Sequence, residues 1–265
     1  MKLSQISLAA LLAVSALPSL AQTAAAPAAE PDFTVSGNLG IFSDYRFRGI
    51  SQTNKNPAIQ GGVDLNTKWG FYLGNWNSNV DANGFSGANI EMDFYGGWKT
   101  TFEGGFGLDL GVLYYYYPGS GNQSSYPGSW KTNNTELYVA GSWGPLALKY
   151  SYAVSDFFGI PDTKGAYYVL LSGAHDFGNG FGVNASVGYQ GGLKAGSQGY
   201  TSCVTEFNGT VACSITDYKI GGTYTIDGWV IGLSYVSTNR DLPGWTDTAK
   251  NISNGTALVS VTKSF

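Results

Sequence analysis

Apolar and polar side chains alternate with a period of two through most of this chain. In residues 33–48 the odd positions carry side chains such as Val35, Leu39 and Ile41, whereas the even positions carry polar ones such as Asn38 and Asp44. Such alternation predicts strands with one apolar and one polar face. The same pattern recurs in 59–66, 90–99, 106–116, 146–152, 181–190, 216–226 and 229–235. The chain is therefore expected to be all-β.

The apolar faces are more easily explained by lipid than by a soluble core. Charged residues make up 12% of the sequence, against about 25% in soluble proteins. After residue 21 no apolar run approaches the roughly 20 residues of a membrane-spanning helix, so a closed barrel is the membrane fold that remains. The alternative is a soluble periplasmic β-sandwich, whose strands also alternate because one face packs on a core. Scarce charge favours the barrel.

Short and long connections alternate between the expected strands. The short turns, rich in Gly, Pro, Asn and Asp, lie at 68–70, 103–105, 143–145, 178–180 and 227–228. The long polar loops lie near 49–57, 81–88, 118–133, 156–164, 193–213 and 241–255. Tight periplasmic turns and long outer loops are typical of outer-membrane proteins. We predict a transmembrane antiparallel up-and-down β-barrel of about 12 strands with both termini on the periplasmic side.

Aromatic residues sort by position along the expected strands into two groups. One group lies at the short turns: Trp69, Trp98, Phe106, Trp143, Phe177, Phe181 and Trp229. The other lies toward the long loops: Tyr45, Phe47, Tyr114, Tyr116, Tyr150, Tyr152, Tyr167, Tyr189 and Tyr235. Two such belts are expected where a barrel crosses the two membrane interfaces.

The two ends of the chain predict export and assembly. Residues 1–21 have an early Lys2, a short apolar run and a small-residue cleavage step, as in a signal peptide. Residues 22–32 form an Ala/Pro-rich periplasmic linker, which leaves 33–265 for the barrel. The terminal Phe265 resembles the signal that the outer-membrane barrel-assembly machinery reads. The expected location is the outer membrane of a Gram-negative bacterium, with its lipid as a partner.

Charge and cysteine content narrow the remaining partners. Loss of the signal removes Lys2 and no acid, so the mature chain is one unit more negative than the −4 of the whole sequence. The basic residues are scattered, so nucleic acid is not an expected partner. Cys203 and Cys213 should form a local disulfide in the oxidising periplasm. A metal pair is the weaker alternative, since no His, Asp or Glu cluster surrounds them.

Charged residues on the polar strand faces should line the lumen. Asp44, Arg46 and Arg48 share the polar face expected to extend the first strand, and Asp64, Glu91 and Asp93 should lie on neighbouring strands. These six are candidates for an acid–base constriction that selects ions. Further lumen residues are expected around the wall: Lys99, Asp109, Glu136, Lys149, Asp217 and Lys219. The alternative is that all of them satisfy one another as a structural plug. The net acidity favours cations weakly.

An enzyme is not expected. The single histidine, His175, points toward lipid by its alternation with Val169 and Leu171, and no hydroxyl and orienting acid complete a nucleophilic site around it. We also expect no cofactor and no metal.

Several motifs resemble one known family. The segment 43–53 reads SDYRFRGISQT and is followed by NPAIQGGVD at 56–64. Two further blocks are GNW with SNV at 74–80 and EMD with YGG at 91–97. Together they resemble the TorF-like porin family of proteobacteria. The resemblance implies an outer-membrane channel for passive diffusion of small hydrophilic solutes or ions and brings no catalytic residues. The alternative function is a non-conducting structural or adhesion barrel that acts through its outer loops.

Overall fold

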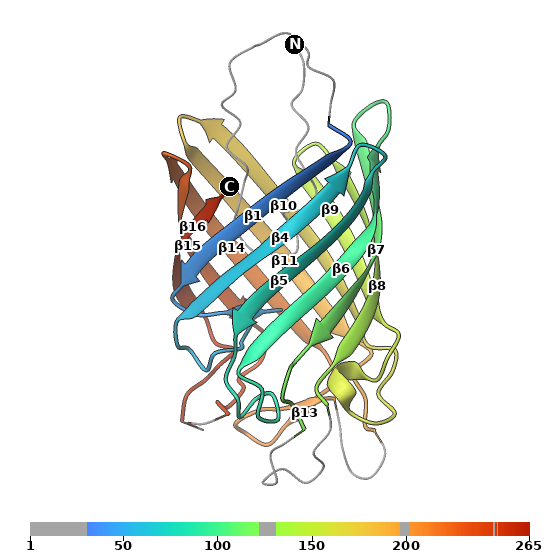
Figure 1. Ribbon diagram of the computed structural model, residues 1–265. Coiled ribbons are helices and arrows are strands. Elements are labelled where there is room, and N and C mark those ends of the chain that lie inside the picture. Colours follow the sequence, from blue (N-terminus) through green and yellow to red (C-terminus); the bar gives the residue numbers. More distant parts are fainter. Residues whose placement is uncertain (1–30, 122–130, 197–201, 246, 248) are drawn as a thin grey trace.

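The computed structural model describes residues 31–121, 131–196, 202–245, 247 and 249–265. Within them the chain forms a closed antiparallel barrel of twelve strands (Figure 1). These are β1 (Phe33–Phe42), β4 (Ala58–Thr67), β5 (Phe71–Asn79), β6 (Ile90–Thr101), β7 (Phe106–Tyr116), β8 (Asn134–Trp143), β9 (Leu146–Ala153), β10 (Tyr167–Gly178), β11 (Phe181–Gly191), β14 (Ile215–Ile226), β15 (Trp229–Thr238) and β16 (Thr256–Ser264). Each pairs with the barrel strands that precede and follow it in sequence, so the expected up-and-down topology is confirmed.

The first and last strands close the barrel. β1 pairs with β16, and Gly37 and Phe265 exchange two backbone hydrogen bonds of 2.7 and 2.9 Å. The carboxyl-terminal residue is thus part of the seam. The expected signal at 1–21 and most of the expected linker at 22–32 lie outside the described residues. No helix among the described residues has the length and apolarity to cross a membrane.

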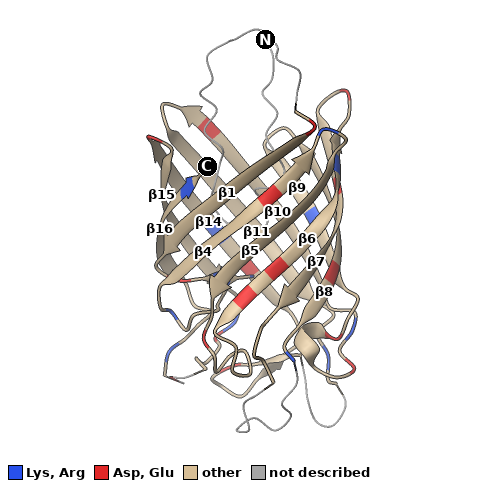
Figure 2. Ribbon diagram, in the orientation of Figure 1, with Lys and Arg blue, Asp and Glu red and all other residues tan. Residues whose placement is uncertain are grey.

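The period-two pattern becomes an apolar outside and a polar inside. Ile41, Leu73 and Ile220 remain 60%, 62% and 64% exposed on the outer surface. In water such exposure would cost about 25 cal/mol per Å² of apolar surface, a cost that hydrocarbon removes. The alternate positions, such as Asp93 and Ser151, point into the barrel and are buried. Charged positions are sparse along the strands (Figure 2).

The connections confirm the predicted turns and place all short ones at one end. In the turns 179–180 and 227–228, Asn179 and Asp227 have φ of 54° and 50° and the following glycines have φ of 82° and 76°. Positive φ at both positions matches the right-handed twist of a two-residue hairpin. The start of β1 and the carboxyl terminus lie on the same side of the barrel as these short turns, and the long loops lie on the opposite side (Figure 1). The expected loops 118–133, 193–213 and 241–255 fall partly outside the described residues.

The outer aromatic residues form the two expected groups with two exceptions. Trp143 and Phe181 are exposed near the short turns, and Tyr150 and Tyr235 are exposed toward the long loops. Tyr45 and Phe47 do not join them: Tyr45 is 8% exposed inside the barrel, and Phe47 packs beside the inward-facing Tyr115. Their assignment to the outer belt was wrong because β1 ends at Phe42 and the chain then turns inward.

The cysteine pair forms the expected disulfide within a long loop. Cys203 and Cys213 are bonded and lie beside the small hairpin of β12 (Val204–Thr205) and β13 (Val211–Ala212). The loop joins β11 to β14, which pair directly with each other along ten positions from Phe181 to Gln190. The disulfide therefore restrains the loop rather than the barrel wall.

Replacing both cysteines by Ser should make this loop susceptible to protease and leave the barrel folded. Closing a loop of this size contributes about 2–3 kcal/mol by restricting the open chain, and here that contribution acts on the β12–β13 hairpin alone. Limited proteolysis with heat-modifiable gel mobility checks both parts. Loss of the folded barrel band would contradict the expectation.

Candidate functional site

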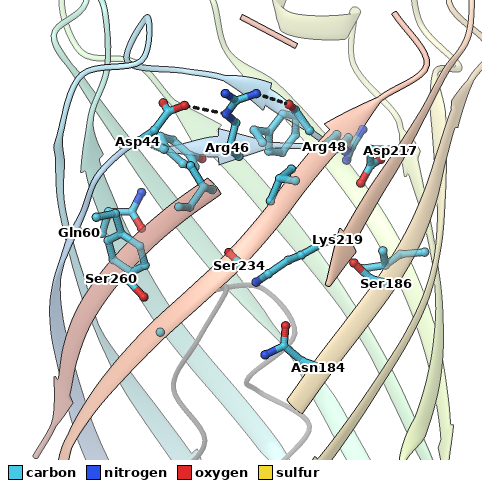
Figure 3. A pocket seen from close by; sticks show the side chains of 18 of the residues that line it. Asp44, Arg46, Arg48, Gln60, Asn184, Ser186, Asp217, Lys219, Ser234 and Ser260 are labelled. Carbon is cyan, nitrogen blue, oxygen red and sulfur yellow. Dashed lines mark hydrogen bonds and ion pairs between the residues drawn. The ribbon is translucent and has the colours of Figure 1, made fainter. Parts of the chain in front are cut away.

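A hairpin enters the lumen directly after β1. β2 (Arg46–Phe47) and β3 (Ile50–Ser51) pair antiparallel, and Arg48 and Gly49 form the turn with φ of 48° and 81°. Residues 43–57, here called the inner hairpin, leave the barrel wall at Phe42 and rejoin it at Ala58. In Figure 3 the inner hairpin crosses the interior of the barrel. The alternation predicted that Asp44, Arg46 and Arg48 extend the first strand. The structure places them on the inner hairpin instead.

Arg46 fixes the base of the inner hairpin. Its Nε donates to Asp44 at 2.6 Å, and its Nη1 donates to the backbone carbonyls of Gly49 and Ile252 at 3.0 and 2.9 Å. Its Nη2 donates to the hydroxyl of Thr256, at the start of β16, at 3.0 Å. Both members of the Arg46–Asp44 pair have 4% exposed side chains. The guanidinium thereby connects Asp44 to Gly49 within the hairpin. It also connects the hairpin to the loop before β16.

Asp44 holds the return strand of the hairpin. Its Oδ1 accepts hydrogen bonds from the hydroxyls of Ser51 and Thr53 at 2.5 and 3.0 Å. Both carboxylate oxygens are thus occupied, one by Arg46 and one by the two hydroxyls. The buried carboxylate of Asp44 therefore has hydrogen-bond donors on both oxygens, which stabilises the base of the inner hairpin.

Arg48 reaches the opposite wall of the barrel. Its Nη2 lies 2.8 and 2.7 Å from the two carboxylate oxygens of Glu136 on β8, and its Nη1 donates to Gln190 on β11. Its guanidinium also stacks 4.4 Å from the ring centroid of Tyr168 on β10. The side chains of Arg48 and Glu136 are 8% and 2% exposed. Breaking a buried pair of this kind costs about 3–5 kcal/mol because it leaves one charge unpaired.

Gly49 allows the hairpin tip to approach the wall. A Cβ at this position would overlap Thr238 on β15 and lie 2.8 Å from the Cβ of Asp217 on β14. The left-handed φ of 81° is also unfavourable for other residues. The neighbouring Arg48 also has a left-handed conformation, which costs about 1–2 kcal/mol. Its ion pair with Glu136 offsets this cost.

One side of the lumen is filled by aromatic side chains. Tyr45 donates to Glu91 at 3.0 Å and packs edge-on against Trp76 with ring centroids 5.3 Å apart. Burial raises the pKa of Tyr45 well above its ordinary value, and the nearby Glu91 adds to this, so the hydroxyl stays a donor. Phe47 packs in the same way against Tyr115, with centroids 5.7 Å apart.

Tyrosine hydroxyls also satisfy the acids deeper on this side. Tyr72 donates to Asp109 and Tyr95 donates to Asp64, each at 2.6 Å. Basic residues here have partners of their own: Lys99 donates to Asn66 at 2.7 Å, and the ammonium of Lys149 lies 3.9 Å from the ring centroid of Tyr138. This half of the lumen therefore matches the plug that was the alternative interpretation.

The other side of the lumen, formed by β11, β14, β15 and β16, carries small side chains. The inward positions include Gly188, Gly221 and Gly232, together with short polar residues that line a cavity of about 200 Å³. Figure 3 shows this cavity under the inner hairpin, with Asn184, Ser186, Lys219, Ser234 and Ser260 around it. The open volume is thus displaced toward one wall.

The predicted lumen residues all point inward but do not form one cluster. The wall residues are Asp64 on β4, Glu91, Asp93 and Lys99 on β6, Asp109 on β7, Glu136 on β8, Lys149 on β9, and Asp217 and Lys219 on β14. The six proposed for the constriction are divided: Glu91 bonds to Tyr45 of the inner hairpin, whereas Asp64 bonds to Tyr95 on β6. Arg48 instead pairs with Glu136, which the alternation had placed elsewhere on the wall.

Several residues of the site were not identified from the sequence as site residues. Gln190 and Tyr168 hold Arg48, and Tyr72 and Tyr138 lie against each other between Asp109 and Lys149. The one local signal was Gly49, because glycine is favoured at the second position of a two-residue turn; it marks the turn and not the partners of Arg48.

His175 lies outside the barrel, as expected. It is exposed on the outer face of β10, and its ring packs 4.8 Å from that of Phe177. No group of three His, Cys, Asp or Glu suited to a metal ion occurs in the described part of the chain.

Comparisons with known proteins support the fold and provide a family. The family described as "Bacterial protein of unknown function (Gcw_chp)" matches residues 24–265. No curated protein matches the sequence. Among solved structures, "KdgM porin in complex with disordered oligogalacturonate" has a TM-score of 0.51 at 10% identity, covering 87% of this chain and 98% of that one. The NanC porin has a TM-score of 0.48 at 11% identity, covering 88% and 99%.

Proposed function

This chain belongs to the Gcw_chp family of bacterial proteins of unknown function, and we propose that it is a porin-like channel of the outer membrane. In this proposal small hydrophilic solutes or ions diffuse passively through the barrel along their own gradient. The inner hairpin, residues 43–57, is the constriction at the long-loop end. The motifs at 43–97, which resemble those of TorF-like porins, support this proposal.

The open wall of the lumen is the observation that carries the proposal. Inward glycines and serines on β11, β14, β15 and β16 leave a cavity of about 200 Å³, lined by both polar and apolar side chains, that a barrel serving only as a scaffold does not need. Small barrels are commonly filled by their own side chains, as the opposite half of this one is. Small residues that keep one wall open and place hydroxyl and amide groups on it favour passage of a solute.

Export and assembly complete the proposal. Residues 1–21 act as a cleaved signal peptide, and Phe265 is the residue read by the barrel-assembly machinery. The hydrogen bonds between Phe265 and Gly37 support this role, because the terminal residue then also completes the closing seam.

A non-conducting structural or adhesion barrel is the second candidate. It is favoured by the inner hairpin, whose two arginines bind both sides of the mouth, and by the aromatic packing on β5–β8. In that case the long outer loops would carry the function.

Conductance in planar bilayers under a salt gradient separates the two candidates. We expect the refolded chain to produce discrete current steps with a defined reversal potential. The same chain carrying Lys68→Ala, which breaks an exposed ion pair with Asp32 at the short-turn end, should conduct equally. Absence of steps both in the wild-type chain and in a variant without the inner hairpin would overturn the channel.

A further inference from the structure

Lys219 is the exception among the basic residues of the lumen. Arg46 and Arg48 pair with Asp44 and Glu136, Lys99 bonds to Asn66, and Lys149 lies over the Tyr138 ring. Among the residues that the structure describes, none forms a hydrogen bond or ion pair with Lys219. Figure 3 shows its side chain extending into the cavity. A partly buried ammonium without a partner is costly, and an anion beside it removes much of that cost.

The nearest acid is already engaged. Asp217 lies two residues before Lys219 on the same inward face of β14. Both of its carboxylate oxygens accept from the hydroxyl of Tyr168, at 2.9 and 3.1 Å. Asp217 therefore faces Tyr168 and the Arg48 end of the cavity, and the ammonium of Lys219 stays available.

Neutral side chains with hydrogen-bond donors lie at the strand positions next to Lys219. Ser186 on β11 is directly paired with Lys219, and Asn184 and Ser234 flank Gly221 in the next inward row. Because Gly221 has no side chain, Ser234 and Asn184 can approach each other across it: a Cβ there would lie 2.9 Å from the Cβ of Ser234 and 3.2 Å from the Oδ1 of Asn184. Hydroxyl and amide groups can donate to an anion's oxygens and also accept from hydroxyl groups of a solute.

We propose that Lys219, Asn184, Ser186 and Ser234 bind a small organic anion within the lumen. The proposal names the solute class of the channel proposed above, and as a statement about transport it rests on that function. It reverses the weak preference for cations that the net charge suggested. A permeating solute meets the local charges of its path. Of the acids that line the cavity, Asp44 is paired with Arg46 and Asp217 accepts from Tyr168, whereas Asp93 lies on β6, across the barrel from Lys219 on β14.

Binding can be measured without any current. The full chain in detergent is titrated calorimetrically at low salt with sodium gluconate and, as a neutral solute of similar size, with glucose. We expect gluconate to bind and glucose not to. Lys219→Gln should weaken gluconate binding about tenfold or more, because a hydrogen bond to a charged group is lost. Lys219→Arg keeps the positive charge and should retain gluconate binding. This variant therefore tests whether the barrel tolerates a substitution at position 219.

A lysine outside the lumen provides the matched control. Lys263 on β16 lies on the outer face, with its ammonium 4.9 Å from the ring centroid of Trp229. Lys263→Gln should leave gluconate binding unchanged. Two results would overturn the proposed anion site: an equal loss of gluconate binding in Lys263→Gln and Lys219→Gln, or unchanged gluconate binding in Lys219→Gln.

The two proposals fail in different ways. A barrel that conducts but does not bind gluconate keeps the channel and overturns the anion site. A barrel that binds gluconate through Lys219 but carries no current, with or without the inner hairpin, keeps the site and overturns the channel. In a conducting barrel, Lys219→Gln should also shift the reversal potential toward that of a cation-selective pore.

Discussion

Removing the inner hairpin should raise the single-channel conductance several-fold. Phe42 and Ala58 are directly paired in the wall, so an Asn-Gly turn can join them in place of residues 43–57. All twelve barrel strands and their pairing remain, whereas the side chains of Tyr45, Arg46, Phe47 and Arg48 leave the lumen. Water then reaches Glu136 and Asp217 and hydrates their carboxylates.

The measurement is planar-bilayer conductance, with the folded state checked by heat-modifiable gel mobility. The variant without the Cys203–Cys213 disulfide is the control, because it alters another long loop while leaving the inner hairpin intact. It should keep the wild-type conductance. A hairpin-free barrel that folds and conducts like the wild type would show that residues 43–57 are not the constriction.

Breaking the Arg48–Glu136 pair should release the tip of the inner hairpin without unfolding the barrel. Arg48→Ala leaves Glu136, 2% exposed, without its guanidinium, at a cost of about 3–5 kcal/mol. Because the hairpin can move away and admit water, most of this cost should appear as hairpin opening. The double variant with Glu136→Ala as well should open less than Arg48→Ala alone, since no buried carboxylate remains.

Thiol labelling reports this opening. Ile50→Cys, in a chain with Cys203→Ser and Cys213→Ser, places a single thiol on the return strand of the hairpin. Reaction with a water-soluble maleimide should accelerate at least tenfold on Arg48→Ala, as expected for a loss of more than about 1.4 kcal/mol. Lys68→Ala, which breaks an exposed pair instead, should not change the rate. Equal rates in all of these variants would remove Arg48 as the anchor.

Much of the wall could be predicted from residues that are neighbours in sequence. Alternation predicted which residues of β6 and β14 face inward, and Asn-Gly and Asp-Gly predicted the tight turns at 179–180 and 227–228. The same reasoning extended β1 through Tyr45 and Phe47, and there it was wrong. A segment inside the lumen also meets a polar face and an aromatic face, so its alternation does not distinguish it from a strand in the wall.

The sequence by itself determined the strands, their faces, the short turns and the disulfide, because each depends on side-chain periodicity or on residues close in the chain. Only the tertiary structure decided that Arg48 meets Glu136, 88 residues away, and that tyrosine hydroxyls donate to Asp64, Glu91 and Asp109. It also decided that the lumen is open on one side and that, within the described part of the chain, no residue forms a hydrogen bond or ion pair with Lys219. The physical reason is barrel closure, which brings the inward faces of strands distant in sequence around a common space. Which charges are then paired depends on the distances across that space.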